Sequence, residues 1–317
     1  MLRKHLFIID PIEGLNLALD SSLRMAHSLQ ELNQETYACQ IEDLYWQSGK
    51  KPSCKARLFN FDLNSKKVSI NDEKSFALDS FQSILMRKDP PFDLSYIAST
   101  WFLDQNKKSL VINKPSTLRS FNEKMGTLFF PEICKATLIS SNPKQLCSYI
   151  LQETNNDAVL KPLHLYGGRD VLHMKDLSQN ELFSRLMEIT ENGKTPRMVQ
   201  KFDPRIYDGE IRVFLLAGKV LSGCLKVPKK GDFLANTAAG ATLHSYKLSK
   251  KLKDKIERLG NKLLKWGIYF AGLDIIGDEV SEINVTSPRL LIAPGDDKDY
   301  YSLIAKWILK TSQRSSV

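Results

Sequence analysis

Residues 272–288 read GLDIIGDEVSEINVTSP and indicate the fold more clearly than any other stretch of this chain. Two apolar runs flank a Gly-Asp pair at Gly277 and Asp278, a pattern that predicts two β-strands joined by a tight turn. Three oxygen-bearing side chains interrupt the apolar runs, namely Asp274, Glu282 and Asn284. These residues carry the first indication of chemistry.

Strand periodicity brings the three side chains together. If the turn comprises the three residues 277–279, Asp274 faces Glu282 across the hairpin, and Asn284 lies on the same face as Glu282. Two carboxylates and an amide oxygen suit a hard cation that shares phosphate oxygens, Mg²⁺ above all. The alternative is an edge hairpin with an ordinary polar face. Other segments of the chain favour the metal site.

Length and composition limit the class of protein. At 317 residues and 36.1 kDa, the chain is too long for one ordinary core and predicts two or three domains. Hydrophobic content of 42% and charged content of 26% are typical of a soluble globular protein. The first apolar run stops at Asp10-Pro11, too early for a signal peptide, and no window approaches the ~18–20 apolar residues of a membrane span. We therefore expect a cytoplasmic protein without a membrane partner.

Cysteine spacing and net charge exclude further classes. The five cysteines are scattered without a Cys-x-x-Cys pair, which argues against a zinc site and a disulfide framework and for reduced thiols. The net charge of +9 is spread out, and its densest run, 247–255, reads as the solvated face of a helix. We expect no nucleic-acid partner. The positive charge suits an enzyme that gathers anionic nucleotide and carboxylate substrates.

The predicted elements change in kind along the chain. Up to about residue 124, strands at 6–10, 38–44, 83–87 and 111–115 alternate with helices at 20–32 and 117–127, which indicates an α/β unit with a partly parallel sheet. An α+β pattern follows, with strands at 136–140, 157–162, 198–201, 210–217 and 220–226 and helices at 143–153 and 249–266. The polar tail 311–317 is expected to fray.

Several short motifs accompany the hairpin in one order. They are Asp10-Pro11, Asp20-Ser21-Ser22, Arg87-Lys88-Asp89-Pro90-Pro91-Phe92-Asp93, Asn122-Glu123-Lys124, Leu160-Lys161-Pro162, Asp208-Gly209 with Arg212, and Asn236 with Ala238-Ala239-Gly240. Nearly end to end, the chain resembles the ATP-grasp carboxylate–amine ligases, and among them the bacterial glutathione synthetases. The combination of the 87–93 motif with the hairpin is specific to that family.

The resemblance implies an α/β protein of the ATP-grasp fold with an N-terminal Rossmann-like (pre-ATP-grasp) α/β domain. It implies a first domain at 1–123, a small α+β lid at 124–200, and a C-terminal ATP-grasp domain at 201–317 with the metal site. A mobile loop is implied at 229–240, and its composition agrees, since it has no apolar period. Loops of this kind exclude water from a reactive intermediate.

The resemblance also assigns roles to individual residues. It gives ATP binding to Lys124, Lys161, Gly167, Gly168, Gln200, Lys201, Phe202 and Asp208, catalysis to Arg212 and Lys226, and metal binding to Asp274, Glu282 and Asn284; the substrate-binding set is Asp20, Ser21, Arg87, Asn236, Ser287 and Arg289. Lysines suit phosphate oxygens as point charges, and a fixed arginine fork suits a transferring phosphoryl group. Taken alone, the lysines read as exposed solubilising residues.

The chain departs from the family pattern in four places. His164-Leu165-Tyr166 stands where the family has Asp-Gly-Met, and the bulky pair must point away from the phosphate path or close part of it. Lys226 replaces an arginine, and Gly-Asp-Phe-Leu-Ala at 231–235 replaces Gly-Glu-Thr-Arg-Gly. After Pro288 the family's Thr-Cys-Ile-Arg-Glu-Ile becomes Arg-Leu-Leu-Ile-Ala-Pro, which bears on the acceptor substrate.

The activity implied by the resemblance is that of glutathione synthetase. ATP phosphorylates the cysteinyl carboxylate of γ-glutamylcysteine, and the amine of glycine then displaces phosphate. ATP is a co-substrate, Mg²⁺ or Mn²⁺ is the cofactor, and the family implies a homo-oligomer. Two alternatives stay open: a ligase of the same mechanism with another acid or amine, and a nucleotide-binding relative without turnover.

Overall fold

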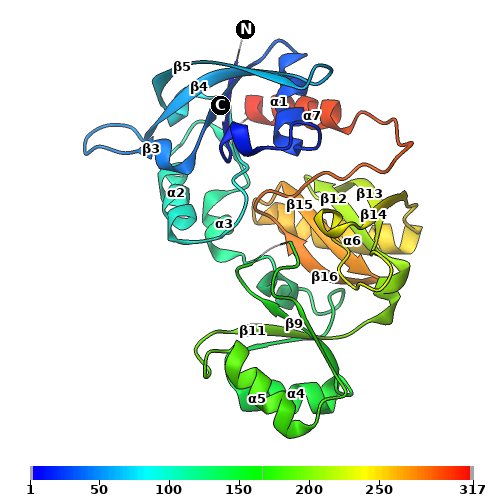
Figure 1. The fold of residues 1–317 in the computed structure, drawn as a ribbon. Helices are drawn as coiled ribbons and strands as arrows, with labels where there is room; N and C mark the ends of the chain where they lie inside the picture. Colours follow the sequence, from blue (N-terminus) through cyan, green and yellow to red (C-terminus); the bar gives the residue numbers. More distant parts are fainter. Residues whose placement is uncertain (1–2, 166, 315–317) are drawn as a thin grey trace.

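The computed structural model describes residues 3–165 and 167–314, and the chain in these ranges forms three sheets (Figure 1). The first has seven strands, in the order β3-β4-β2-β1-β6-β7 with β5 paired to β4. They are β1 (Lys4–Ile8), β2 (Glu35–Cys39), β3 (Leu44–Tyr45), β4 (Ser53–Asp62), β5 (Lys67–Ala77), β6 (Ser83–Met86) and β7 (Leu110–Ile112). Because β2, β1, β6 and β7 run parallel, the predicted α/β unit with a partly parallel sheet is confirmed.

Helices cover both faces of this sheet, so its central strands are apolar on both sides. Alternation along β1 sends Phe7 toward α1 (Ser21–Gln30), while Leu6 and Ile8 face α2 (Leu94–Asp104) and α3 (Pro115–Ser120). Helix α1 begins where Asp20 accepts hydrogen bonds from the backbone amides of Ser22 (2.8 Å) and Leu23 (2.9 Å).

Three predictions for this part were incomplete or wrong. The hairpin of β4 and β5 and the helix α2 were missed, since β5 is polar on both faces and has no alternation. The helix predicted at 117–127 ends at Ser120, and a 3₁₀ helix follows at Met125–Phe129. The break has a local cause, because Asn122 Oδ1 accepts from the amides of Lys124 (3.0 Å) and Met125 (3.1 Å), an Asx turn.

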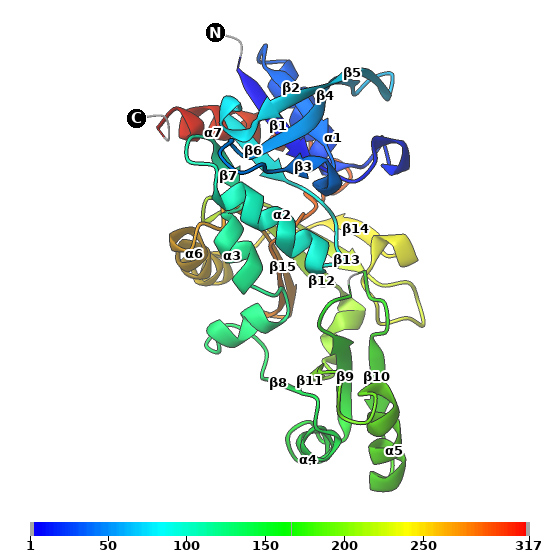
Figure 2. The same cartoon turned by 90° about the vertical axis from the view of Figure 1, so that its left-hand side faces the viewer.

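The second sheet is antiparallel and has the order β10-β9-β11-β8. Its elements are β8 (Thr137–Ser140), α4 (Pro143–Glu153), β9 (Asp157–Pro162), β10 (Leu172–Lys175), α5 (Gln179–Ile189) and β11 (Arg197–Lys201). Both helices pack on it through one apolar cluster that includes Leu146, Leu160 and Leu186. This sheet and its helices lie at the end of the molecule away from the N-terminal sheet (Figure 2).

The third sheet is antiparallel, with the order β14-β13-β12-β15-β16. Its strands are β12 (Glu210–Leu216), β13 (Lys219–Val227), β14 (Thr242–Ser245), β15 (Phe270–Ile276) and β16 (Glu279–Asn284). Helix α6 (Lys250–Lys265) packs on the sheet through buried side chains at helical spacing, Leu252, Ile256, Leu259 and Leu263. Its lysines Lys250, Lys251 and Lys253 are exposed, so the prediction of a solvated helix face is confirmed.

The last helix, α7 (Tyr300–Arg314), returns to the first sheet and packs against α1 (Figure 1). Ile304 and Ile308 join the apolar cluster of Leu23 and Leu29 there. The fraying predicted from residue 311 is therefore wrong up to Arg314, and residues 315–317 lie outside the described residues. Of the helices in the described ranges, none has the length and apolarity needed to cross a membrane.

A close approach of α6 to the turn between β12 and β13 predicts an unusual stability change. A Cβ atom at Gly260 would lie 2.5 Å from the carbonyl oxygen of Gly218, so helix or turn would have to shift. Helix propensity alone would favour alanine by about 1 kcal/mol. We expect Gly260→Ala to unfold at lower urea concentration than the native protein, whereas Lys253→Ala on the exposed face changes stability by less than about 0.5 kcal/mol. A stabilised Gly260→Ala variant would contradict this packing.

Candidate active site

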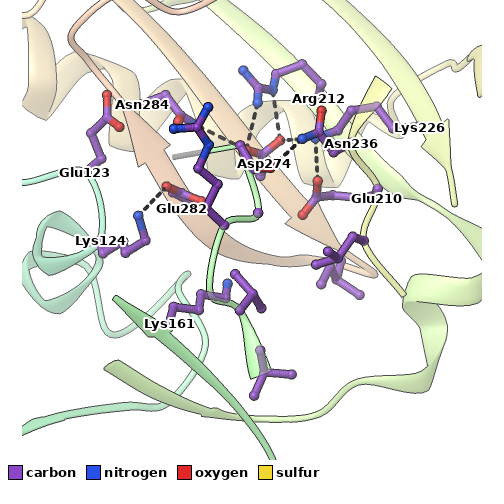
Figure 3. A pocket seen from close by; sticks show the side chains of 18 of the residues that line it. Glu123, Lys124, Lys161, Glu210, Arg212, Lys226, Asn236, Asp274, Glu282 and Asn284 are labelled. Carbon is purple, nitrogen blue, oxygen red and sulfur yellow. Dashed lines mark hydrogen bonds and ion pairs between the residues drawn. The ribbon is translucent and has the colours of Figure 1, made fainter. Parts of the chain in front are cut away.

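A cavity of about 360 Å³ is lined by residues from all three parts of the chain (Figure 3). Its charged lining comprises Asp89, Glu123, Lys124, Lys135, Lys161, Arg169, Lys201, Asp203, Glu210, Arg212, Lys226, Asp274, Glu282 and Arg289. Apolar side chains, among them Val159, Phe202, Ile206 and Ile276, line the end next to the second sheet. The cavity thus has one charged and one apolar region.

The hairpin of β15 and β16 forms with a turn of two residues, Gly277 and Asp278. Ile276 pairs with Glu279, so the predicted three-residue turn is wrong. A bulge between Asp274 and Ile275 absorbs the extra residue, and Asp274 still faces Glu282. Because Gly272 faces Asn284 on the same ladder, the three predicted metal ligands share one face, as expected.

Asp274 lies at the centre of a buried polar network and is 5% exposed. Arg212 donates two parallel bonds to it, Nε to Oδ1 (2.8 Å) and Nη2 to Oδ2 (2.9 Å). Lys226 Nζ lies 2.8 Å from Oδ1, and Asn284 Nδ2 lies 3.0 Å from Oδ2. Burial opposes ionisation of the carboxyl, but Arg212 and Lys226 outweigh it and hold the pKa of Asp274 below its usual range.

Glu210, which is partly buried, is a second carboxylate in the network, and it was not predicted from the sequence. Its Oε2 forms an ion pair with Lys226 Nζ. Burial, followed by the negative charge of Asp274, raises the pKa of Glu210. A signal was available, because Glu210 lies two residues before Arg212 on a predicted strand and therefore shares its face.

The two predicted phosphate-binding lysines both line the cavity. Lys124 Nζ donates to the carbonyl of Leu165 (2.7 Å) and lies 3.4 Å from Glu282 Oε1. Lys161 Nζ donates to Gln200 Oε1 (3.1 Å), and burial lowers the pKa of this lysine. Lys124 is buried and Lys161 is partly buried, so reading them as exposed solubilising residues is wrong.

Glu123 holds the end of β16 in place and was also not predicted. Its Oε1 accepts bonds from the amides of Val285 (3.1 Å) and Thr286 (3.2 Å) and from the Thr286 hydroxyl (2.8 Å). Burial, then the charge of Glu282, raises the pKa of Glu123. The segment between the first and second sheets is therefore fastened directly to the hairpin.

The glycine turn and the 229–240 loop meet at the cavity. Gly167 and Gly168 have φ of 69° and 78°, a conformation that favours glycine. Asn236 donates from Nδ2 to the Gly167 carbonyl, and Leu234 lies 3.4 Å from where a Cβ of Gly168 would be. Leu165 lines the cavity, while Tyr166 lies outside the described residues.

The apolar end is built on β11 and the residues that follow it. Gln200, Lys201 and Phe202 line the cavity as predicted. Behind Phe202 the imidazole of His173 stacks at 4.0 Å between ring centroids, and Phe233 of the loop lies 6.0 Å from Phe202. Asp208, however, is exposed and is absent from the cavity lining, so the structure does not bring it to the predicted ATP site.

The predicted substrate-binding residues fall into two groups. Asn236, Ser287 and Arg289 line the cavity. Asp20, Ser21 and Arg87 do not; in this structure they are supports. Asp20 caps α1, Ser21 Oγ accepts from the Leu290 amide (3.1 Å), and Arg87 Nη2 donates to the Pro288 carbonyl (3.2 Å). Ser21 and Arg87 hold the segment that presents Ser287 and Arg289.

Solved structures of ATP-grasp ligases share this fold. D-cycloserine synthetase DcsG matches with a TM-score of 0.67 and 11% identity over 96% of this chain and 99% of that one. The ATP-grasp ligase PsnB, complexed with a minimal precursor, matches with a TM-score of 0.62 and 15% identity over 98% and 99%. The chain thus has an ATP-grasp fold, with strands and helices of mixed α/β type.

Two family models cover most of the chain: the prokaryotic glutathione synthetase N-terminal domain at residues 4–119 and the prokaryotic glutathione synthetase ATP-grasp domain at 123–293. Glutathione synthetases from Citrobacter rodentium and Escherichia coli O6:H1 are 36% and 35% identical over 288 residues, and each match covers 90% of both chains. The chain belongs to the prokaryotic glutathione synthetase family, and it is an ATP-dependent carbon–nitrogen ligase.

Burial of the Lys161 ammonium predicts separate effects on binding and stability. Removing a charged hydrogen-bond donor of about 1.5–3 kcal/mol should weaken ATP binding roughly 10- to 100-fold in Lys161→Met. The melting temperature should stay the same or rise, because burial of the charged ammonium costs desolvation free energy in the folded native protein, and methionine removes that cost. Calorimetric titration with ATP and thermal unfolding measure the two effects, with exposed Lys194→Met as the control. A lower melting temperature with normal ATP affinity would mark Lys161 as structural.

Proposed function

We propose that this protein joins γ-glutamylcysteine to glycine and releases ADP and phosphate, as a glutathione synthetase. The supporting observation is the cavity in which Lys124, Lys161, Arg212 and Lys226 face the carboxylates of the hairpin. Its charges suit a nucleotide phosphate chain and a substrate carboxylate. The relatives that match 90% of the chain carry the name glutathione synthetase, which supports the choice of substrates.

The reaction needs two transfers. An oxygen of the cysteinyl carboxylate attacks the γ-phosphorus of ATP, the bond to ADP breaks, and an acyl phosphate forms. The neutral amine of glycine then attacks the acyl carbon and expels phosphate. A carboxylate needs no base before it attacks phosphorus, so the protein contributes mainly positioning and charge stabilisation.

The charged lining fits these steps residue by residue. Lys124 and Lys161 bind phosphate oxygens of ATP as point charges, and the guanidinium of Arg212 stabilises charge on the transferring phosphoryl group. Lys226 lies on β13, the strand next to the one that carries Arg212, and it neutralises negative charge beside the same phosphoryl group. Adenine occupies the apolar end, where Phe202, Ile206 and Ile276 lie together.

The donor set of Asp274, Glu282 and Asn284 fits a hard divalent cation, Mg²⁺ or Mn²⁺. Within residues 3–165 and 167–314, no three His, Cys, Asp or Glu side chains form a group that could hold a metal. The amide oxygen of Asn284 would add a third oxygen donor to the two carboxylates of the hairpin. When bound, the cation neutralises charge on the phosphates and helps to orient them.

Domain limits and setting belong to the same proposal. We place the boundaries at 123/124 and 200/201, with α7 packed back on the first domain. The 229–240 loop acts as a lid whose ordering depends on substrate. The five buried free thiols suit a reducing, cytoplasmic setting. The family suits a homo-oligomer.

A ligase that uses another acid or amine is the second candidate. Arg289, which follows the hairpin, lines the cavity, as does Phe233 of the altered loop. New side chains in these two places would change the substrate rather than the phosphoryl transfer.

A coupled assay of ADP release tests the proposal. We expect release with ATP, γ-glutamylcysteine and glycine together, with a matching yield of tripeptide by mass spectrometry, and none when either amino substrate is absent. Glu282→Gln should abolish turnover and keep the native circular dichroism spectrum, because it removes only a charge from the hairpin face. Turnover only with another acid–amine pair would favour the second candidate, and ATP binding without turnover on any pair would favour a non-catalytic relative.

Leu234 predicts imperfect coupling of the two steps. In the family pattern an arginine occupies its position, and here Leu234 packs over Gly168 instead. Without the charge, we expect the lid to close less firmly, so that water hydrolyses part of the acyl phosphate. The ratio of phosphate to peptide should exceed one in the native protein and fall in Leu234→Arg. An unaltered one-to-one ratio in both proteins would contradict a role for this position in closure.

A further inference from the structure

We propose that Lys226 holds the place of a divalent cation on Asp274, and that Glu210 is the positioning residue that takes Lys226 over when the cation binds. The inference rests on the proposed metal site of Asp274, Glu282 and Asn284. It goes further in naming what must move before that site can be loaded, and which side chain makes the movement favourable.

The acceptor capacity of Asp274 is fully used in this structure. Arg212 and Lys226 donate to Oδ1 at 2.8 Å each, and Arg212 and Asn284 donate to Oδ2 at 2.9 and 3.0 Å. A carboxylate offers about four lone-pair positions. None is left for a cation, so one of the donors has to leave when a metal binds.

Lys226 is the donor whose departure costs least. Arg212 is held by two parallel bonds and is the direct cross-strand partner of Asp274, so its fork cannot turn away without losing both. Asn284, as a proposed ligand through its amide oxygen, gives up its own bond to Oδ2, but this leaves the Lys226 ammonium on the same carboxylate, where its charge repels a cation. Lys226 makes one contact with Asp274, through an ammonium that acts as a point charge and can turn about its flexible stem.

A displaced ammonium needs another acceptor, because Lys226 is only 6% exposed. An uncompensated buried charge would be strongly unfavourable. Glu210 provides that acceptor: it is the cross-strand partner of Lys226 on β12 and β13, and its Oε2 already forms an ion pair with the ammonium (Figure 3). Lys226 therefore can leave Asp274 without leaving Glu210.

Mn²⁺ binding to the full chain at saturating ADP, measured by electron paramagnetic resonance of the free ion, tests the exchange. Lys226→Met removes the competitor and should bind Mn²⁺ about 10-fold more tightly, a change of about 1.4 kcal/mol. Glu210→Gln leaves Lys226 with Asp274 alone and should bind about 10-fold more weakly, whereas Glu210→Asp keeps a carboxylate and should retain most of the affinity.

The double variant separates exchange from a general effect of charge. If Glu210 acts through Lys226, Glu210→Gln should change Mn²⁺ affinity by less than about 2-fold once Lys226 is methionine. Equal weakening in both backgrounds would overturn the proposal. Lys135→Met is the matched control, since it removes another ammonium from the cavity lining, one that pairs with Asp203 rather than Asp274. If Lys135→Met increased Mn²⁺ affinity as much as Lys226→Met does, this result would also overturn the proposal.

Failure of the metal site itself has a different signature. If the native protein binds no Mn²⁺ beyond that held by ADP, or if Asp274→Asn binds it as well as the native protein, the assignment of Asp274 is wrong and the exchange falls with it. Peptide formation, measured separately, then shows whether the proposed reaction survives. Circular dichroism spectra confirm that each variant is folded.

Discussion

The paired hydrogen bonds between Arg212 and Asp274 are the interaction on which the rest of the site depends. The two residues are opposite each other on β12 and β15, in the middle of the third sheet. Lys226 joins them from β13 and Asn284 from β16, so one charge network crosses four neighbouring strands. Such a buried network adds little net stability compared with apolar packing. Its value is positional, because each charge is held by another and all face one cavity.

The first and third parts of the chain are joined at this cavity through polar contacts to the main chain. Glu123 binds the amides of Val285 and Thr286, and its own carbonyl accepts from the Ile283 amide (3.1 Å). On the other side, Arg87 holds the Pro288 carbonyl where the chain leaves the sheet for α7. The segment after β16, which carries Ser287 and Arg289, is thus held by Glu123 on one side and by Arg87 on the other. Arg87, which does not line the cavity, thus still helps to decide what is presented in it.

The loop contacts show how altered residues are accommodated. Phe233 packs near the stacked pair of Phe202 and His173, Ala235 is buried beside Phe202, and Leu234 covers Gly168. The loop therefore meets the second sheet through apolar packing where the family pattern has polar residues. Apolar contacts are less directional than ion pairs. This difference separates the loop of this chain from the hairpin, in which Asp274, Glu282 and Asn284 match the family pattern.

Local signals in the sequence determined much of the fold and the centre of the site. Helix caps, alternation and the Gly-Asp turn predicted α4, β9 and the hairpin closely, because these depend on neighbours within a few residues. Strand period alone placed Asp274, Glu282 and Asn284 on one face. The family resemblance supplied Lys124, Lys161 and Arg212, and all three line the cavity.

Only the tertiary structure decided the features that depend on distant partners. The bulge at Ile275 rather than a longer turn sets the register of the hairpin. Burial made Glu210 part of the charge network and left Asp208, two residues earlier, exposed outside the cavity. Arg87 became a support because Pro288 lies within its reach, although 201 residues separate them. Residue type and spacing can propose a chemical role, but burial and the partner across the sheet determine whether a side chain performs it.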